Sequence, residues 1–257
     1  MNKGTNKLEA LQAVIKDAYR IFGRYSAPTH PLDACTCPVC MTPELEQGMR
    51  QLPLAQLGRQ HFYEYNNAAN GPEQAADEVL FLLPRMLELM AEGEELHHSI
   101  ELAWDRLGRC PAGSFSQAEM DVLNRFALAY FERALSGQRA LHDAPLSIML
   151  MFHIGGLSTE PLTDLWARMD DPRSTVQYVE DTYWHFWEKQ DYSNPFAEDR
   201  PVFREQLKLW ISSPEHRQRF AEKLMAPEFQ SLAALQRPTG VIPFSTMVDA
   251  AFDQLTQ

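Results

Sequence analysis

The stretch PEQAADEVLFLLPRMLELMAEGEELHHSIELAWDRLG, residues 72–108, determines the fold class. Its apolar residues recur three and four positions apart, which is the spacing of one face of an α-helix. Pro84 lies inside this pattern, and a proline lacks the backbone N–H and clashes with the preceding helical turn. We therefore expect a helical segment that is either kinked at Pro84 or divided there into two helices.

The same helical spacing continues through the rest of the chain. An apolar stripe runs from about residue 6 to residue 25, and a second helical pattern joins Leu54 to Tyr65. SQAE at residues 116–119 is a capping box that opens an amphipathic helix. Thr42-Pro43-Glu44 and Ser213-Pro214-Glu215 are typical helix starts, because a cap residue precedes a first-turn proline. Further helices are predicted at residues 145–155, 160–169, 174–190, 200–212, 214–225 and 244–255.

No segment alternates β-branched and polar residues, so the sequence predicts an all-α protein of about ten to twelve helices. Short connections between successive helices favour antiparallel neighbours, in an irregular bundle or an array of helical pairs. A proline- and cysteine-rich loop separates the first two helices. We expect one domain over residues 1–257. Helix signals pause at LHDAPLS, residues 141–147, which is where a domain boundary would fall.

Charge and composition exclude several classes of partner. The net charge of -12 argues against nucleic acid and against an anionic membrane surface, because both require a basic protein surface. A protein partner with a basic surface suits this charge better. No run of residues is long and apolar enough to cross a bilayer, and the N-terminus lacks the apolar core of a secretion signal. We expect a cytoplasmic protein.

Three of the four cysteines fall within six residues, in the loop HPLDACTCPVCMTPE at 30–44. Cys37 and Cys40 have the C-x-x-C spacing with which two thiolates hold one tetrahedral ion, and Cys35 is close enough to be a third ligand. Thiolates prefer zinc and related soft ions. Clustered cysteines in a chain without a secretion signal favour metal or thiol chemistry over a disulfide framework. The sequence therefore predicts a zinc site, structural in role because the loop joins two helices.

A four-coordinate zinc site needs a fourth ligand. His30 is the nearest candidate along the chain, and His61 and Cys110 are the alternatives. Two other interpretations of the loop stay open. Its thiols could pack as small apolar groups in a rigid loop, or their spacing could lower a thiol pKa for redox or nucleophilic chemistry.

Five residues outside the loop are candidates for a binding surface: Arg85, His97, His98, Trp184 and Trp187. Arg85 follows Pro84 and precedes two glutamates at helical spacing, so a salt bridge is the plainer interpretation. The two histidines lie in a charged segment that favours a solvated helix end. The two tryptophans belong to an aromatic stretch that favours core packing, although tryptophan is also a common interface anchor.

The order of motifs in the N-terminal third resembles a group of bacterial helical proteins. The cysteine cluster is followed by Pro43-Glu44, by PLAQL at 53–57 and by FLLPRMLEL at 81–89. The group carries a cysteine cluster, a PLREL-like helix and an FLPRxLEL segment, and PLAQL departs from the charged form of its second motif. The resemblance covers residues 20 to 95. It implies a bacterial, mostly helical protein and no particular reaction.

The sequence contains no nucleophile elbow, phosphate-binding loop, dinucleotide fingerprint or His-Glu-x-x-His motif. We therefore expect a non-enzymatic helical protein that acts by binding another protein, with zinc in its cysteine-rich loop. The alternative is a metal- or thiol-dependent enzyme centred on Cys35, Cys37 and Cys40.

Overall fold

The computed structural model describes residues 3–137, 143–236 and 241–257, and within these ranges the protein is all-helical, without a strand. Thirteen α-helices are described: α1 (Lys3–Phe22), α2 (Pro43–Gln51), α3 (Arg59–Asn67), α4 (Ala76–Glu92), α5 (Asp105–Gly108), α6 (Gln117–Leu135), α7 (Pro145–Ile154), α8 (Glu160–Arg168), α9 (Pro172–His185), α10 (Pro201–Ser212), α11 (Pro214–Met225), α12 (Pro227–Ala233) and α13 (Phe244–Thr256). Three short 3-10 helices are η1 (Leu54–Gln56), η2 (Ile100–Leu102) and η3 (Pro195–Ala197). The all-α prediction is confirmed, and the expected ten to twelve helices come close to the count.

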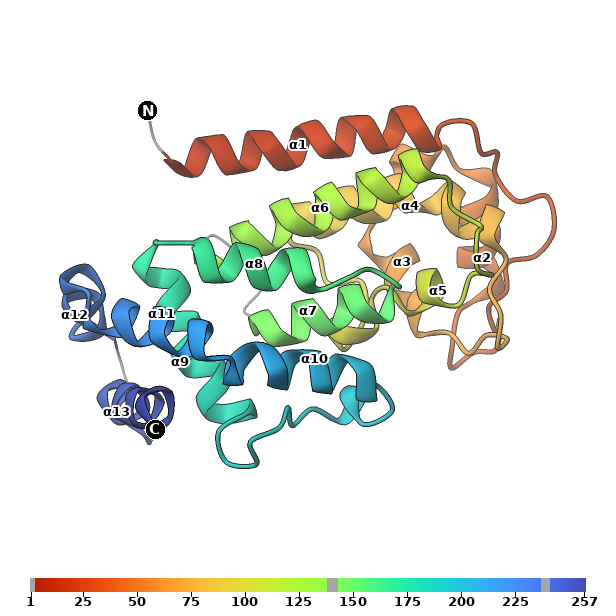
Figure 1. The fold of residues 1–257 in the computed structure, drawn as a ribbon. Helices are drawn as coiled ribbons and strands as arrows, with labels where there is room; N and C mark the ends of the chain where they lie inside the picture. The colour runs from red at the N-terminus through yellow and green to blue at the C-terminus, as the bar shows by residue number, and fades with distance from the viewer. Residues whose placement is uncertain (1–2, 138–142, 237–240) are drawn as a thin grey trace.

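The helices form an irregular bundle that is elongated between two ends (Figure 1). Helix α1 lies along α6 and α4 and covers one side of the molecule. The long loop between α1 and α2 lies at one end, together with α2 and α5. Helices α12 and α13 lie at the opposite end, where both pack against α9. The cysteine-rich loop and the C-terminal helices are therefore far apart.

Several helices begin where their local chemistry predicts. The Thr42 side chain accepts a hydrogen bond from the Leu45 N–H, and Pro43 occupies the first turn of α2. Ser213 caps α11 in the same way. At α6 the Glu119 carboxylate accepts a hydrogen bond from the Ser116 N–H over 2.7 Å, which completes the capping box. These caps satisfy N–H groups that have no partner inside the helix.

Helix α4 runs unbroken through Pro84, so a division into two helices is wrong. Pro84 has no N–H group to donate to the Leu80 carbonyl, and the loss of this hydrogen bond makes the interior of a helix an unfavourable position for proline. Leu80, Leu83 and Leu87 are almost completely buried around it, however. Burial of this apolar helix on several sides stabilises the helical path more than the missing hydrogen bond destabilises it.

Two other elements differ from the sequence prediction. The pattern from Leu54 to Tyr65 is divided at Leu57 and Gly58 into η1 and α3. Helix α12 was not predicted, because its seven residues are too few to show a periodic apolar face. It is held instead by the fully buried Phe229, whose ring lies 6.4 Å from that of Phe244 on α13.

The backbone of α5 packs very closely against the end of α7. A Cβ atom on Gly108 would lie 1.8 Å from the Ile154 carbonyl oxygen, and one on Gly155 would lie 2.7 Å from the Trp104 ring. Trp104 itself is fully buried and stacks edge-on against Phe152. Glycine at these positions allows the backbones to touch, which joins residues before and after the α6 helix in one core.

Part of the predicted boundary at 141–147 lies outside the described residues, since 138–142 are not described, and α7 begins at Pro145. The single-domain organisation stays a prediction. Within the described part of the chain, no helix combines the length and the apolar composition that a bilayer crossing requires.

Candidate metal centre

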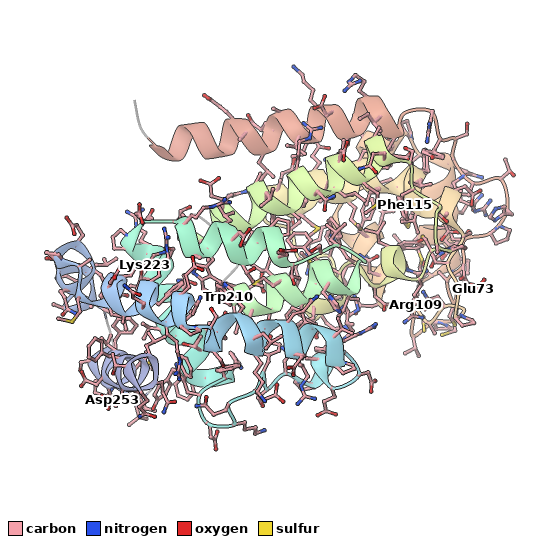
Figure 2. All side chains as sticks on the ribbon, viewed as in Figure 1. Glu73, Arg109, Phe115, Trp210, Lys223 and Asp253 are labelled. Atoms are coloured by element: carbon pink, nitrogen blue, oxygen red, sulfur yellow. The ribbon has the colours of Figure 1, made fainter. Side chains whose placement is uncertain are left out.

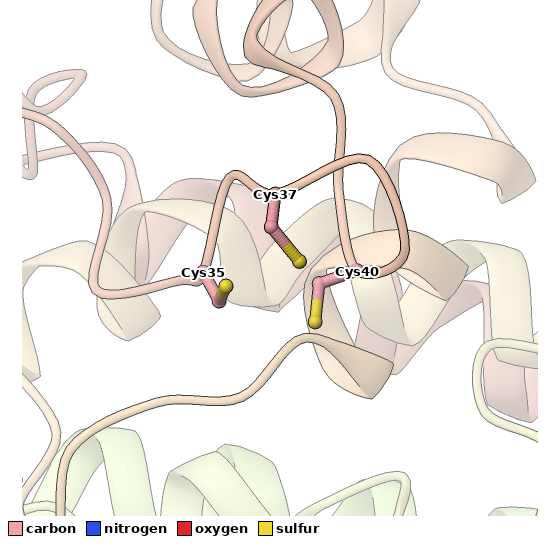
Figure 3. A group of neighbouring side chains, drawn as sticks. All are labelled: Cys35, Cys37 and Cys40. Carbon is pink, nitrogen blue, oxygen red and sulfur yellow. The ribbon is translucent and has the colours of Figure 1, made fainter.

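The loop between α1 and α2 brings Cys35, Cys37 and Cys40 together. One sulfur atom from each lies within 4.8 Å of the other two, and all three residues are half-buried. Figure 3 shows the side chains converging inside the turn of the loop. The Cys40 N–H donates to the Cys37 carbonyl over 3.1 Å, which closes a tight turn around Pro38 and Val39. The turn therefore presents three sulfur ligands to one point.

Backbone hydrogen bonds fix the chain on the N-terminal side of this turn. The Leu32 N–H donates to the buried Glu46 carboxylate over 2.8 Å, and the Cys35 N–H donates to the Ala69 carbonyl over 2.7 Å. The Asp33 N–H donates to Glu78 at the start of α4 over 3.0 Å. Residues 32–35 are thus attached to α2, to the end of α3 and to α4, so the first cysteine has a fixed position.

Beneath this segment lies a buried polar network centred on Arg106. Its guanidinium donates to the carbonyls of Asp33 and Tyr65 over 2.7 and 2.6 Å, and to the Gln74 side chain over 2.6 Å. Gln74 and the Tyr65 hydroxyl in turn donate to the Glu78 carboxylate. Burial and the Glu78 carboxylate raise the Tyr65 pKa, so the hydroxyl stays a donor. Each buried polar side chain here has a partner, as a stable buried network requires.

The environment of the loop favours a thiolate at Cys37. The Val39 N–H, the Cys35 thiol and the Cys40 N–H hydrogen-bond to its sulfur and lower its pKa to about 7. For Cys35, a hydrogen bond from the Cys37 N–H lowers the pKa, but hydrogen bonds with the Cys37 and Cys40 thiols and burial outweigh it and raise the pKa overall. One thiolate therefore forms readily, and a bound cation would also require the neighbouring thiols to lose their protons.

The three candidates for a fourth ligand do not join the cysteine group. His30 is exposed, and its Nδ1 lies 3.0 Å from the Pro31 carbonyl oxygen. The Nδ1 atom of His61 accepts from the Gly58 N–H, and the Cys110 thiol donates to the Arg106 carbonyl. Burial and the Glu78 carboxylate raise the Cys110 pKa to about 12, which keeps that thiol protonated. A fourth ligand among the three stays a prediction.

The geometry of the cluster suits a soft cation. Three thiolates favour zinc and related ions over hard oxygen-seeking ions such as magnesium. Their sulfur separations fit a single ion, because two ligands on one tetrahedral zinc at about 2.3 Å lie close to 4 Å apart. With three protein ligands, a tetrahedral ion would need a fourth ligand, either a water molecule or a group from another residue or molecule.

Arg85 and the histidine pair are not part of this cluster. The Arg85 guanidinium pairs with Glu88 over 2.5 Å and donates to the Leu57 carbonyl, and the Tyr19 hydroxyl also donates to Glu88. His97 is buried, and burial lowers its pKa to about 4, so it is neutral near pH 7. His98 is exposed and contacts Asn67. Arg85 forms the salt bridge that its spacing suggests.

The two tryptophans differ in exposure. Trp184 is 46% exposed, whereas Trp187 is 8% exposed and belongs to the core. The side chain of Trp184 is therefore accessible at the surface, whereas that of Trp187 is not, and a binding role for either stays a prediction.

Comparisons with protein-family models, with curated proteins and with solved structures give no match for this chain. The resemblance of residues 20–95 to a bacterial group thus stays a prediction.

Sequence reasoning missed the residues that hold the loop. Glu78 and Arg106 lie inside largely apolar stretches. A charged residue at such a position indicates a buried polar network, because a buried charge needs partners. Their partners, however, come from residues 33, 65 and 74, and no local pattern connects these positions.

We predict that Arg106→Leu destabilises the protein by about 3 kcal/mol or more, because it leaves several buried acceptors without a donor. Urea unfolding measures the loss, and hydrogen exchange at the Cys35 amide reports whether the loop loosens. Arg109→Leu is the matched control. Arg109 is more exposed and pairs with Asp105 over 2.6 Å, so its removal should cost about 1 kcal/mol or less. Equal losses would contradict a central role for Arg106.

We predict that metal-free protein is alkylated at Cys37 with a half-maximal rate near pH 7, because its lowered pKa exposes thiolate at neutral pH. The rate should rise as the pH increases through this value. Cys110 should react slowly up to pH 10, since its pKa is about 12. Mass spectrometry of peptides after iodoacetamide pulses measures both rates. A Cys37 rate that first rises above pH 8 would exclude the assigned environment.

Proposed function

We propose that this chain is a non-enzymatic, protein-binding helical protein whose cysteine-rich loop holds a structural zinc ion. The observation that supports it best is the convergence of the Cys35, Cys37 and Cys40 sulfur atoms within 4.8 Å in a loop that is held on both sides, by the hydrogen bonds of residues 32–35 and by the buried Met41. An ion on these thiolates would fix the exposed tip of the turn, Pro38 and Val39.

The tip of the loop has the properties of a contact point. Val39 is 91% exposed between two ligand cysteines, and an apolar side chain at such a position gains free energy when a partner covers it. Zinc would hold the tip in one conformation and so reduce the entropy lost on binding. Other exposed apolar side chains, Trp184, Val202, Leu209 and Met225, widen the surface available to proteins.

A metal- or thiol-dependent enzyme is the second candidate, and one observation favours it. Cys37 combines solvent access with a pKa lowered to about 7, and an ion on three ligands keeps an open position. Catalysis would also need a general base beside the cluster. The described cavities are lined by other residues, which is why we place protein binding first.

The proposed setting is the cytoplasm. All four cysteines are free thiols, as expected in a reducing compartment. The net charge of -12 supports a protein partner over nucleic acid or an anionic membrane.

We predict that the purified, untagged chain binds about one zinc ion, measured by mass spectrometry of metals. The triple variant Cys35→Ser, Cys37→Ser, Cys40→Ser should lose the ion, together with several degrees of melting temperature. Cys110→Ser is the matched control, because it removes the thiol outside the cluster and should keep the ion. Zinc bound equally by wild type and triple variant would refute the site.

We predict that the full chain, purified from bacterial cells, forms a stoichiometric complex with another protein, measured by light scattering after size-exclusion chromatography. The triple cysteine variant should bind the same partner more weakly, because its loop tip is no longer held in one conformation. A wild-type chain that is always a non-interacting monomer would contradict the proposed function.

A further inference from the structure

A preformed groove lies at the end of the molecule opposite the cysteine loop. Its volume is about 410 Å³, and it is lined by Leu224, Met225, Gln230, Val248, Asp249, Phe252 and Asp253, from α11, α12 and α13. Asp253 lies far from Arg109, which marks the other end of the molecule (Figure 2). The groove is thus separate from the candidate metal centre.

Hydrogen bonds between its helices hold the groove in shape. The Arg217 side chain on α11 donates to the Gln254 carbonyl on α13 over 2.9 Å. Gln230 on α12 donates to the Leu224 carbonyl at the end of α11 over 2.5 Å, and Phe229 packs on Phe244 behind it. A groove whose walls are tied together in this way loses little entropy when it is filled.

Four of the seven residues that line the groove are apolar. Leu224 is buried at its base, and Val248 and Phe252 are half-buried one helical turn apart on α13. Met225 is 64% exposed at its edge, and methionine adapts its shape to different apolar partners. Apolar side chains arranged along a channel between helices match the apolar face of another helix.

One rim of the groove is negatively charged. Asp249 and Asp253 lie four residues apart on α13 and therefore on the same face of the helix. Both are exposed, and neither forms an ion pair with another described residue. Two unpaired carboxylates beside an apolar channel complement cations placed one helical turn apart on a partner.

We propose that this groove binds a basic amphipathic helix of a protein partner. The apolar face of that helix fills the channel beside Met225 and Phe252, and its Lys or Arg residues pair with Asp249 and Asp253. The inference rests on the proposed protein-binding function and names one surface and one partner class for it. It does not depend on the zinc site.

The probe is a fluorescein-labelled synthetic helix with leucines at i, i+3, i+4 and i+7 and lysines four residues apart on the flanking face. Fluorescence anisotropy with the full chain measures its affinity, and a scrambled peptide of the same composition is the control. The wild-type chain should bind the amphipathic peptide and bind the scrambled peptide at least about tenfold more weakly. No binding, or equal binding of both peptides, would overturn the inference.

Charge reversal tests the rim. D249K/D253K should weaken peptide binding by about tenfold or more. The matched control is E160K/D164K, which reverses two exposed acids at the same spacing on α8, outside the groove. An equal loss of peptide affinity in the two double variants would mean that the peptide responds only to the net charge of the protein, and it would overturn the inference. Met225→Gln tests the apolar side of the groove and should weaken peptide binding several-fold. The variant should still fold, because the Met225 side chain is largely exposed.

The closing measurement separates this inference from the proposed function. The natural complex from the preceding subsection is formed again with D249K/D253K in place of the wild-type chain. Its loss, with retention in E160K/D164K, supports the groove. If the complex still forms with D249K/D253K, the groove is not the binding site, although the proposed protein-binding function is unaffected. Absence of a complex with the wild-type chain contradicts the proposed function itself.

Discussion

The Arg106 guanidinium connects segments that lie far apart along the chain. It donates to carbonyls of residues 33, 65 and 68 and, through Gln74, reaches the buried Glu78. Its positive charge lies at the carboxyl end of α3, whereas Glu78 lies in the first turn of α4, and each charge complements the dipole of its helix. The cysteine-rich loop begins on this network, so the position of Cys35 depends on it.

Local chemistry explains which parts of the fold the sequence predicts. The starts of α2, α6 and α11 follow from a cap residue and its neighbours within four positions, and the structure has all three. Whether the helix continues through Pro84 could not be predicted in this way, because it depends on the burial of α4 in the tertiary structure. Helix α12 depends likewise on the contact of Phe229 with Phe244, fifteen residues away by sequence number.

In the candidate site, too, local features could be predicted from the sequence and long-range contacts could not. Its three cysteines are close in sequence, so their convergence could be predicted from spacing alone. The residues that hold the loop could not be predicted from spacing, because Glu46, Glu78 and Arg106 reach it from three different helices. The different exposure of the two tryptophans also needed the structure, since only the packing around the end of α9 exposes Trp184 and buries Trp187.

The supports of the loop bear on what an ion would do there. Residues 32–35 are held by the protein's own hydrogen bonds, whereas the tip at Pro38 and Val39 extends toward solvent. Zinc would therefore order the tip and leave the helical core largely unchanged. The close backbone contact of Gly108 with Ile154 packs α5 tightly against the end of α7. The two proposed surfaces lie at opposite ends of the molecule, and energetic coupling between them would need an element with two arrangements.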